Sequence, residues 1–313
     1  MTILVADVGG TNSRLALVDA GAEGAAPQSI MRYTNTEFAS FYDILRRYIG
    51  ARDPGTLTGV CVAIAGPVTS TRAQLTNLNW QFDTGEIATT LLCCGPVRLV
   101  NDIVALGHAL SGLGGDHLSV IKPSSASPLN NQALVVGIGT GFNVCLVKDA
   151  GADRAPLVVE AELGHASLPQ SVWAILHNEV GDAAAQIVAN EDLFSGRGLS
   201  RLYGFVSGDG NLPGAEIVAD YGTKANATRT VDLAAQLLGI FARELVFQYL
   251  PLSGIHFAGG AARGILGTDA RAGFLAAFDG SGPFSDLIGQ VPVKVITDDA
   301  AALVGAARYA RSS

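Results

Sequence analysis

Residues 4–19 read LVADVGGTNSRLALVD, two apolar runs on either side of a Gly-Gly-Thr-Asn turn. Residues 3–6 and 15–18 have the apolar character of β-strands, and the two glycines supply the backbone freedom that a tight connection needs. The stretch therefore predicts a β-hairpin, with Asp7 close to the end of its first strand.

A second hairpin of the same kind is predicted in the middle of the chain. Its turn is GIGTGF at residues 137–142, between apolar runs over residues 134–137 and 144–147. Residues 137–150 can be laid over residues 7–20 without a gap, so that Gly139 meets Gly9. We interpret the match as an internal duplication of architecture, with one hairpin at the head of each half of the chain.

Strands and helices alternate through the rest of the sequence. Apolar periodicity predicts a helix after Thr36 that includes Phe38, a long helix over about 229–249 and a final helix over 300–309. Further strands are predicted over 59–65, 97–100, 255–258 and 293–296. The fold class is therefore α/β, with two related domains, a cleft between them and a boundary at the glycine-rich break of residues 111–115.

Composition excludes several classes of protein. The 313 residues include 20 Lys and Arg against 28 Asp and Glu, a formal net charge of −8, and 49% of them are hydrophobic. An acidic chain with so few cations is not expected to bind nucleic acid or an anionic membrane. The sequence lacks a membrane-length apolar run, and its first residues do not have the pattern of a signal peptide. Four cysteines without zinc-ligand spacing indicate free thiols in a reducing cytoplasm.

Three glycine-rich turns that follow apolar strands could bind phosphate: DVGGTN at 7–12, GIGTG at 137–141 and AGGA at 258–261. Backbone N–H groups in such turns can point together at one anion, although each turn alone could be an ordinary hairpin connection. The run after residue 141 is strand-like, whereas a dinucleotide fingerprint requires a helix there. The turns therefore favour a double hairpin clamp on a polyphosphate.

A second group of polar residues could carry chemistry. Asn101 and Asp102 stand where a strand meets a helix, and side chains at the carboxyl end of a strand often face a ligand cleft. Asp102 could equally be a helix N-cap, and a lone histidine such as His165 is more often structural. Glu162 and Glu191 add two carboxylates. Neither a Ser/His/Asp order nor metal-ligand spacing recommends a hydrolase or a zinc site.

Eight motifs together resemble the bacterial glucokinase family, within the superfamily that joins sugar kinases, heat-shock chaperones and actin. The motifs are LVADVGGTNSRLALVD (4–19), AIAGPV (63–68), LTNLNW (75–80), LVNDIVALGHAL (99–110), GIGTGF (137–142), ELGH (162–165), EDLFSGRGLSRLYG (191–204) and FAGG (257–260). The resemblance runs essentially from end to end. It implies two actin-like or ribonuclease H-like α/β domains: a small one of residues 1–115 rejoined by about 298–313, and a large one of residues 116–297 with added helices.

The resemblance also implies ATP-dependent phosphorylation of glucose at its 6-hydroxyl, as the first step of glycolysis, with Mg²⁺, in a cytoplasmic homodimer. Asp102 would be the catalytic base, and the sugar ligands would be Asn101, Asp102, Glu162, His165 and Glu191. The ATP and phosphate ligands would be Asp7, Gly9, Gly10, Thr11, Asn12, Gly139, Thr140, Gly141, Gly259 and Gly260, with Mg²⁺ near Asp7 and no metal motif of its own.

Two residues depart from the family pattern and bear on the choice of sugar. Leu163 stands where the family has a glycine and could reshape the sugar-side loop, and Asn143 follows the phosphate turn where a small residue is usual. A kinase for fructose or an amino sugar such as N-acetylmannosamine is therefore the main alternative. An ATPase that transfers nothing to a sugar is the alternative from another class. The zinc cluster of related ROK kinases has no counterpart in the sequence.

Overall fold

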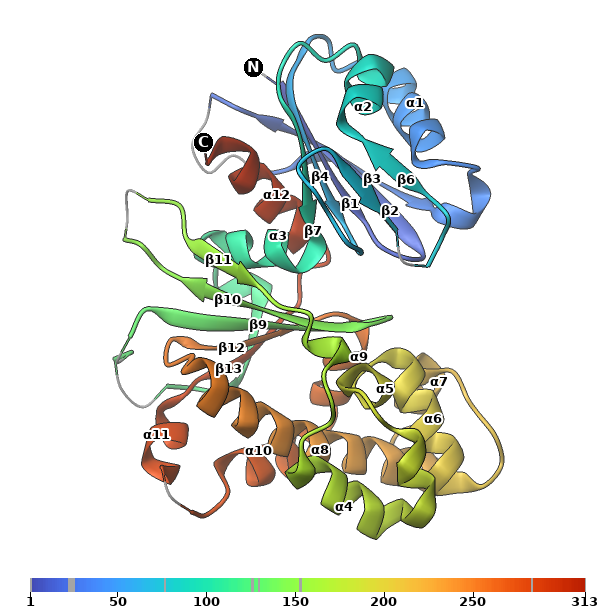
Figure 1. Cartoon of the computed structure of the whole chain (residues 1–313), viewed down its shortest axis with the longest axis vertical. Coiled ribbons are helices and arrows are strands. Elements are labelled where there is room, and N and C mark those ends of the chain that lie inside the picture. The colour runs from blue at the N-terminus through green and yellow to red at the C-terminus, as the bar shows by residue number, and fades with distance from the viewer. Residues whose placement is uncertain are drawn as a thin grey trace. The chain divides into compact units, whose positions relative to one another are not determined.

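A computed structural model of the chain describes residues 2–21, 26–75, 77–124, 127–128, 130–151, 154–282 and 284–312 (Figure 1). The chain divides into two compact units. The smaller unit comprises Met1–Gly114 and Asp298–Ser313, and the larger unit comprises Gly115–Thr297. Residue 76, inside the LTNLNW motif, lies outside the described residues.

The sheet of the smaller unit begins with the predicted hairpin. Strands β1 (Thr2–Val8) and β2 (Asn12–Asp19) pair antiparallel and place Asp7 opposite Arg14. The sheet order is β3-β2-β1-β4-β7, completed by β3 (Gln28–Thr34), β4 (Leu57–Ile64) and β7 (Val97–Asn101). Strands β1, β4 and β7 run parallel to one another, so their carboxyl ends lie at the same edge.

Helices cover both faces of this sheet, with α1 and α2 on one face and α3 and α12 on the other (Figure 1). These helices are α1 (Phe41–Arg52), α2 (Thr84–Leu91), α3 (Asp102–Ala109) and α12 (Ala301–Arg311), and a small hairpin joins β5 (Arg72–Gln74) to β6 (Gln81–Asp83). Strand β1 is buried on both faces between them, which explains its apolar run over residues 3–6.

The helix predicted after Thr36 begins later than expected, and Phe38 lies outside it. Ser40 is its N-cap: the Ser40 hydroxyl accepts from the Asp43 N–H, and the Asp43 carboxylate accepts from the Ser40 N–H. This reciprocal pair favours a helix start at Phe41. Phe38 instead packs edge-on against Tyr33, with ring centroids 5.6 Å apart.

The larger unit repeats the strand connections of the smaller one, which confirms the internal duplication and the α/β class. Its sheet order is β11-β10-β9-β12-β13-β8, with β8 (Leu118–Lys122), β9 (Gln132–Ile138), β10 (Phe142–Lys148), β11 (Leu157–Glu160), β12 (Gly254–Ala258) and β13 (Val293–Ile296). Strand β10 pairs antiparallel with both β9 and β11, whereas β9, β12 and β13 run parallel to one another. The second turn is tighter by one residue, since Ile138 pairs with Phe142 whereas Val8 pairs with Ser13.

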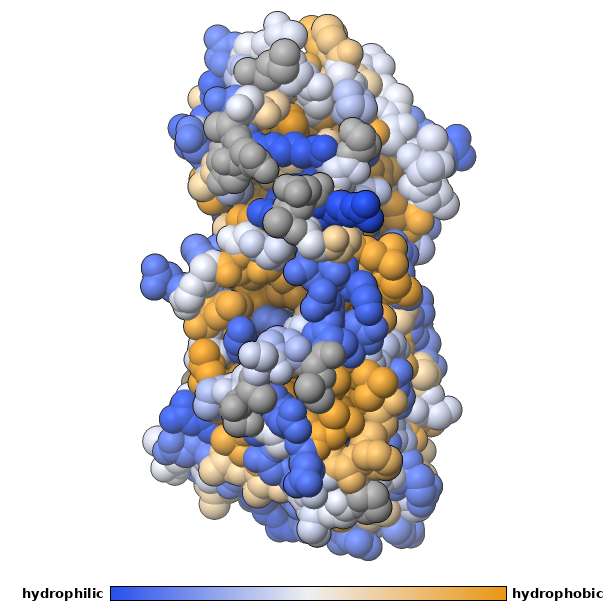
Figure 2. All heavy atoms as spheres, turned by 90° about the vertical axis from the view of Figure 1, so that its left-hand side faces the viewer, coloured by the Kyte–Doolittle hydropathy of each residue, from blue (hydrophilic) through white to orange (hydrophobic). Residues whose placement is uncertain are grey.

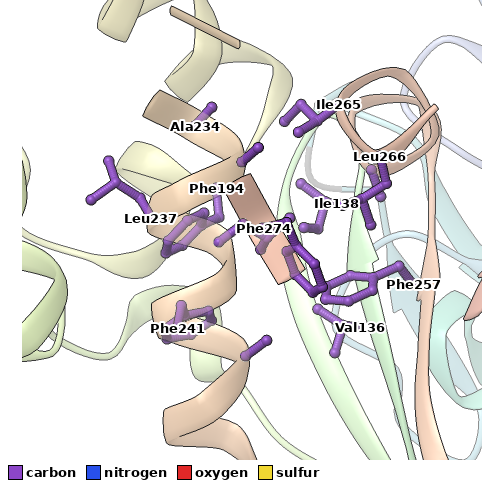
Figure 3. Packing of buried hydrophobic residues seen from close by; sticks show 14 of the residues in the cluster. Val136, Ile138, Phe194, Ala234, Leu237, Phe241, Phe257, Ile265, Leu266 and Phe274 are labelled. Carbon is purple, nitrogen blue, oxygen red and sulfur yellow. The ribbon is translucent and has the colours of Figure 1, made fainter. Parts of the chain in front are cut away.

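The helices of the larger unit supply its apolar core. They are α4 (Gln170–Val180), α5 (Asn190–Leu193), α6 (Gly196–Ser207), α7 (Gly214–Ala219), α8 (Ala225–Tyr249), α9 (Gly260–Leu266), α10 (Arg271–Asp279) and α11 (Ser285–Gln290). Figure 3 shows Phe274 of α10 between α8 and Phe257 of β12. Phe241 of α8 stacks on Phe194 at 4.7 Å between ring centroids. This packing holds β9 rigidly up to Ile138, where its turn begins.

Apolar side chains also reach the surface of the larger unit, where Figure 2 shows them in orange among hydrophilic ones on one face. The large apolar residues that are exposed in the described part of this unit are Val120, Leu157, Val159, Val188, Phe247, Leu250 and Phe284. Within the described ranges, the helices do not combine the length and apolar character needed to cross a membrane.

Gly305 allows α12 to pack directly on α3, the helix that begins at Asp102. A Cβ atom at position 305 would overlap the carbonyl oxygen of Ala105. We expect Gly305→Ala to lower the free energy of unfolding by about 2 kcal/mol or more, because the two helix backbones must separate. Chemical denaturation followed by circular dichroism measures the change.

Gly273→Ala is the matched control, because an added Cβ on this exposed residue of α10 meets no atom within 4 Å. Alanine is the better helix former by about 1 kcal/mol, so this control should leave stability unchanged or raise it. Equal stability of the Gly305→Ala variant and the wild type would contradict the close packing of α12 on α3.

Candidate functional site

In the smaller unit the candidate residues lie at one edge of the sheet. Val8 pairs with Ile64, and Ile64 pairs with Asn101, so β1, β4 and β7 end side by side. The Gly-Gly-Thr-Asn turn, the Ala65-Gly66 loop and the start of α3 therefore follow three neighbouring strand ends. Ligands of open α/β sheets bind at such an edge.

The turn of residues 9–12 is held in shape by Asn35, a residue that the sequence did not single out. The Asn35 backbone N–H donates to the carbonyl of Thr11 at 2.9 Å, and its side-chain amide donates to the carbonyl of Gly9 at 2.8 Å. The Ser13 hydroxyl donates to the Asn35 side-chain oxygen at 2.7 Å. Because Asn35 is buried, these bonds satisfy its polar atoms and fix the turn.

Asp7 is buried in β1, two residues before this turn. Arg14 donates to its carboxylate at 3.1 Å, and the same guanidinium lies 3.7 Å from Asp299. Burial raises the pKa of Asp7 above its ordinary value, although the Arg14 guanidinium acts to lower it. Among the other turn residues, Asn12 accepts a hydrogen bond from Arg32 at 3.2 Å. A Cβ atom at Gly10 would lie 2.8 Å from the side-chain nitrogen of Asn77.

Asn101, not Asp102, is the N-cap of α3. The Asn101 side-chain oxygen accepts from the Ile103 N–H at 3.0 Å, and its amide nitrogen donates to the carbonyl of Gly66 at 3.0 Å. Asp102 is the first helical residue, and its carboxylate also accepts from the Ile103 N–H, at 2.9 Å. The helix start thus orients the Asp102 side chain, which is half-buried at the sheet edge.

In the larger unit, Gly259 lies against the second glycine turn, residues 139–141. Strands β9 and β12 run parallel, with Ala258 paired to Gly137, so residues 139–141 and 259–260 follow adjacent strand ends. Gly259 has a φ of +94°, and a Cβ there would overlap the carbonyl oxygen of Ile138. Only glycine therefore allows this approach of the two turns.

The loop that carries Glu162 and His165 lies beside the same turn. It forms a short 3-10 turn over Leu163–His165, and Asn190 donates to the carbonyl of Leu163 at 2.8 Å. Glu162 and His165 are exposed, whereas Leu163 packs against the apolar core of the unit and so anchors the loop.

Glu191 joins this loop to the glycine turn of residues 139–141. Its Oε2 atom accepts from the Phe142 N–H at 3.0 Å, directly after the turn, and its Oε1 atom accepts from Arg197 at 2.9 Å. A Cβ atom at Gly141 would lie 2.6 Å from Glu191 Oε2. The structure therefore brings Glu191 and the turn of residues 139–141 together within one unit. Sequence reasoning missed Arg197 as a partner of Glu191, although it lies inside the quoted EDLFSGRGL motif.

A groove of about 1130 Å³ in the larger unit lies elsewhere, between α8 and α10. It is bordered by small α10 residues such as Gly273 and by charged residues such as Arg229 and Asp232. The predicted site residues are not among those that line it. Across the described part of the chain, His, Cys, Asp and Glu side chains do not gather in groups of three that could hold a metal ion.

Comparison with known proteins gives one consistent result. The glucokinase family model matches residues 4–313. A glucokinase of Saccharophagus degradans is 32% identical over 98% of this chain and 97% of its own length, and one of Yersinia pestis is 30% identical over 98% and 96%.

Solved structures agree in fold. A glucokinase from an Antarctic psychrotroph superposes with a TM-score of 0.79 at 28% identity, covering 100% of this chain and 99% of its own. A ROK family glucokinase from Streptomyces griseus, solved with glucose and AMPPNP, shares the fold with a TM-score of 0.67 at 20% identity, and each chain is covered completely. Because the family model spans nearly the whole sequence and full-length relatives reach 30% identity or more, the chain belongs to the glucokinase family.

Proposed function

We propose that this protein transfers the γ-phosphoryl group of ATP to the 6-hydroxyl of glucose. The observation that carries the proposal is the hydrogen bond from the Phe142 N–H to Glu191. It links a carboxylate suited to bind sugar hydroxyls to the end of a glycine turn suited to bind phosphate. A kinase needs both functions at neighbouring positions, because phosphoryl transfer depends mainly on the positioning of its two substrates.

In this proposal Asp102 is the general base. Its carboxylate would accept the proton of the attacking 6-hydroxyl as the phosphoryl group moves across. Asn101 would contact the sugar with the second hydrogen of its amide, since its oxygen and first amide hydrogen are used by α3 and Gly66. Glu162, His165 and Glu191 would bind the remaining hydroxyls.

The two hairpin turns would bind the phosphates of ATP, and Gly259 and Gly260 would approach the adenosine. Mg²⁺ usually keeps several waters and takes one or two carboxylates together with substrate phosphates. Asp7 would be that carboxylate: it is buried beside the first turn, and its Oδ2 atom already accepts from Arg14. The cation would therefore arrive with the nucleotide, where it supplies neutralising charge on the phosphates.

The remaining parts of the proposal concern domains, assembly and location. The two compact units would be the two domains, and they would close when sugar binds, because water otherwise competes as the phosphoryl acceptor. We also propose a cytoplasmic homodimer, on the resemblance to the family.

Steady-state release of ADP across a panel of free hexoses tests the proposed substrate. We expect the highest kcat/KM for glucose, because a site built on hydrogen bonds leaves polar groups unpaired when a hydroxyl is missing or replaced. Discrimination against fructose and N-acetylmannosamine should exceed about tenfold. A higher kcat/KM for either sugar would keep the kinase class and replace the substrate, whereas ADP release that is independent of every sugar would indicate a plain ATPase.

Asp102→Asn tests the general base. The variant keeps the size and helix position of the side chain but removes the proton acceptor, so kcat should fall by about 10²- to 10⁴-fold. Glucose binding, measured by calorimetry, should stay within about tenfold of wild type. Asp209→Asn, at an exposed turn position, is the matched control. A variant with more than half of the wild-type kcat would remove Asp102 from the mechanism.

Gly139→Val tests the phosphate turn without disturbing the fold. A Cβ at Gly139 meets no described atom within 4 Å, so the larger side chain should be accommodated and would stand where phosphate approaches the backbone. We expect KM for ATP to rise by about tenfold or more while the Kd for glucose changes little. Gly50→Val, at an exposed and equally open position of α1, is the control. Unchanged values of kcat and KM for ATP would make the turn a structural hairpin only.

A further inference from the structure

We propose that Asn143 is a positioning residue that orients the Glu162 carboxylate toward the sugar. It would also fix the loop of residues 162–165, called the sugar loop below, to the strand that follows the phosphate turn. This inference rests on the proposed function and adds to it a determinant of sugar affinity. Asn143 is the second residue of β10, and the turn of residues 139–141 directly precedes that strand.

The side chain of Asn143 holds the loop by both ends of its amide. Its nitrogen donates to Glu162 Oε2 at 3.2 Å. Its oxygen accepts from the backbone N–H of Leu163 at 3.1 Å and from that of Val144 at 2.8 Å. Because backbone N–H groups can only donate, the amide oxygen must face them, and the amide nitrogen must face Glu162. The direction of the hydrogen bond to the carboxylate is therefore determined.

This contact decides which part of Glu162 is presented to a ligand. The bond from Asn143 occupies Oε2, and the described part of the chain offers Oε1 no donor. Glu162 is exposed, so without Asn143 its long side chain would sample several rotamers. Holding it in one rotamer before the sugar arrives lowers the entropic cost of binding, which is the general basis of preorganisation.

The second carboxylate, that of Glu191, is also held in place by hydrogen bonds. The Phe142 N–H binds Glu191 Oε2, and Arg197 binds its Oε1. Gly164 of the sugar loop packs against the carbonyl of Phe142 so closely that a Cβ there would overlap it. Two consecutive residues, Phe142 and Asn143, thus connect both sugar-site carboxylates to the end of the phosphate turn.

The position of Asn143 is itself rigid. It pairs with Gly137 in the antiparallel ladder between β9 and β10, and β9 lies in the interior of the sheet. A side chain on a strand held by its neighbours positions a ligand group more accurately than one on a loop. Because the sheet fixes the position of Asn143, its hydrogen bond also fixes the position of the Glu162 carboxylate, which itself stands on a loop.

Two substitutions separate this role from simple packing. Asn143→Ala removes the bonds to Glu162 and to Leu163. Asn143→Asp keeps the shape and the acceptor for the Leu163 N–H, but it places a second carboxylate at the position from which the amide donates to Glu162. Like charges this close repel, so the isosteric variant should be the worse of the two if the bond to Glu162 matters.

We expect KM for glucose to rise by about tenfold in Asn143→Ala, the loss of one hydrogen bond to a charged group, and by more than that in Asn143→Asp. KM for ATP should stay within about twofold in both variants, which also reports that the larger unit is folded. Asn143→Ser, which cannot span the gap to Glu162, should match Asn143→Ala and serves as its replacement if that variant is insoluble. The control is Asn130→Ala, which should behave as wild type. The Asn130 amide also bridges backbone groups, but it lies at the other end of β9.

The outcomes distinguish this inference from the proposed function. Wild-type turnover of glucose is scored first, and its absence would overturn the function itself. If the wild type is active and Asn143→Asp has an unchanged KM for glucose, the bond to Glu162 has no role and the inference is wrong. A milder effect of Asn143→Asp than of Asn143→Ala would assign Asn143 to packing or to the Leu163 N–H alone, which also overturns it.

Discussion

Parallel strand pairing is the constraint on which both candidate regions depend. In a parallel ladder neighbouring strands end at the same edge, so residues that are distant in sequence become neighbours there. Val8, Ile64 and Asn101 are brought into line in this way in the smaller unit, and Gly137 and Ala258 in the larger one. The glycine turns and Asp102 follow directly after these positions. Their placement therefore requires little beyond the correct register of buried strands.

The parts of the fold that could be predicted from sequence are those with local signals. Glycine turns between apolar runs identified both hairpins, and the buried strand β4 has an unbroken apolar run over residues 60–64. The edge strands β3, β8 and β11 were missed, because most of their residues are exposed or half-buried and lack the apolar pattern of a buried strand. The start of α1 was misplaced because Phe38 continued the helical spacing, whereas the capping pair at Ser40 determined the actual boundary.

The candidate site was predicted by residue type but not by its supporting bonds. Glu191 and the turn of residues 139–141 lie together, and the family motifs marked both. Asn35 was not found, since its partner Gly9 lies 26 positions away and a single asparagine carries no pattern. Asn143 was noted only as a departure from the family, because its bond to Glu162 depends on the pairing of β10 with its neighbours. Such side-chain bonds become visible only when the register of the sheet is known.

Ser13 and Asn143 both follow a glycine turn, but they pair with Val8 and Gly137, so Asn143 stands one residue further along its strand than Ser13 does. Each also contacts a residue just beyond the third strand of its own antiparallel trio: Ser13 bonds to Asn35 after β3, and Asn143 bonds to Glu162 after β11. In the first hairpin both Ser13 and Asn35 are buried, and their hydrogen bond stiffens the turn. In the second hairpin the outer partner is a solvent-facing carboxylate. A hydrogen bond formed soon after each turn thus stiffens the turn in one half of the molecule and holds a solvent-facing carboxylate in the other.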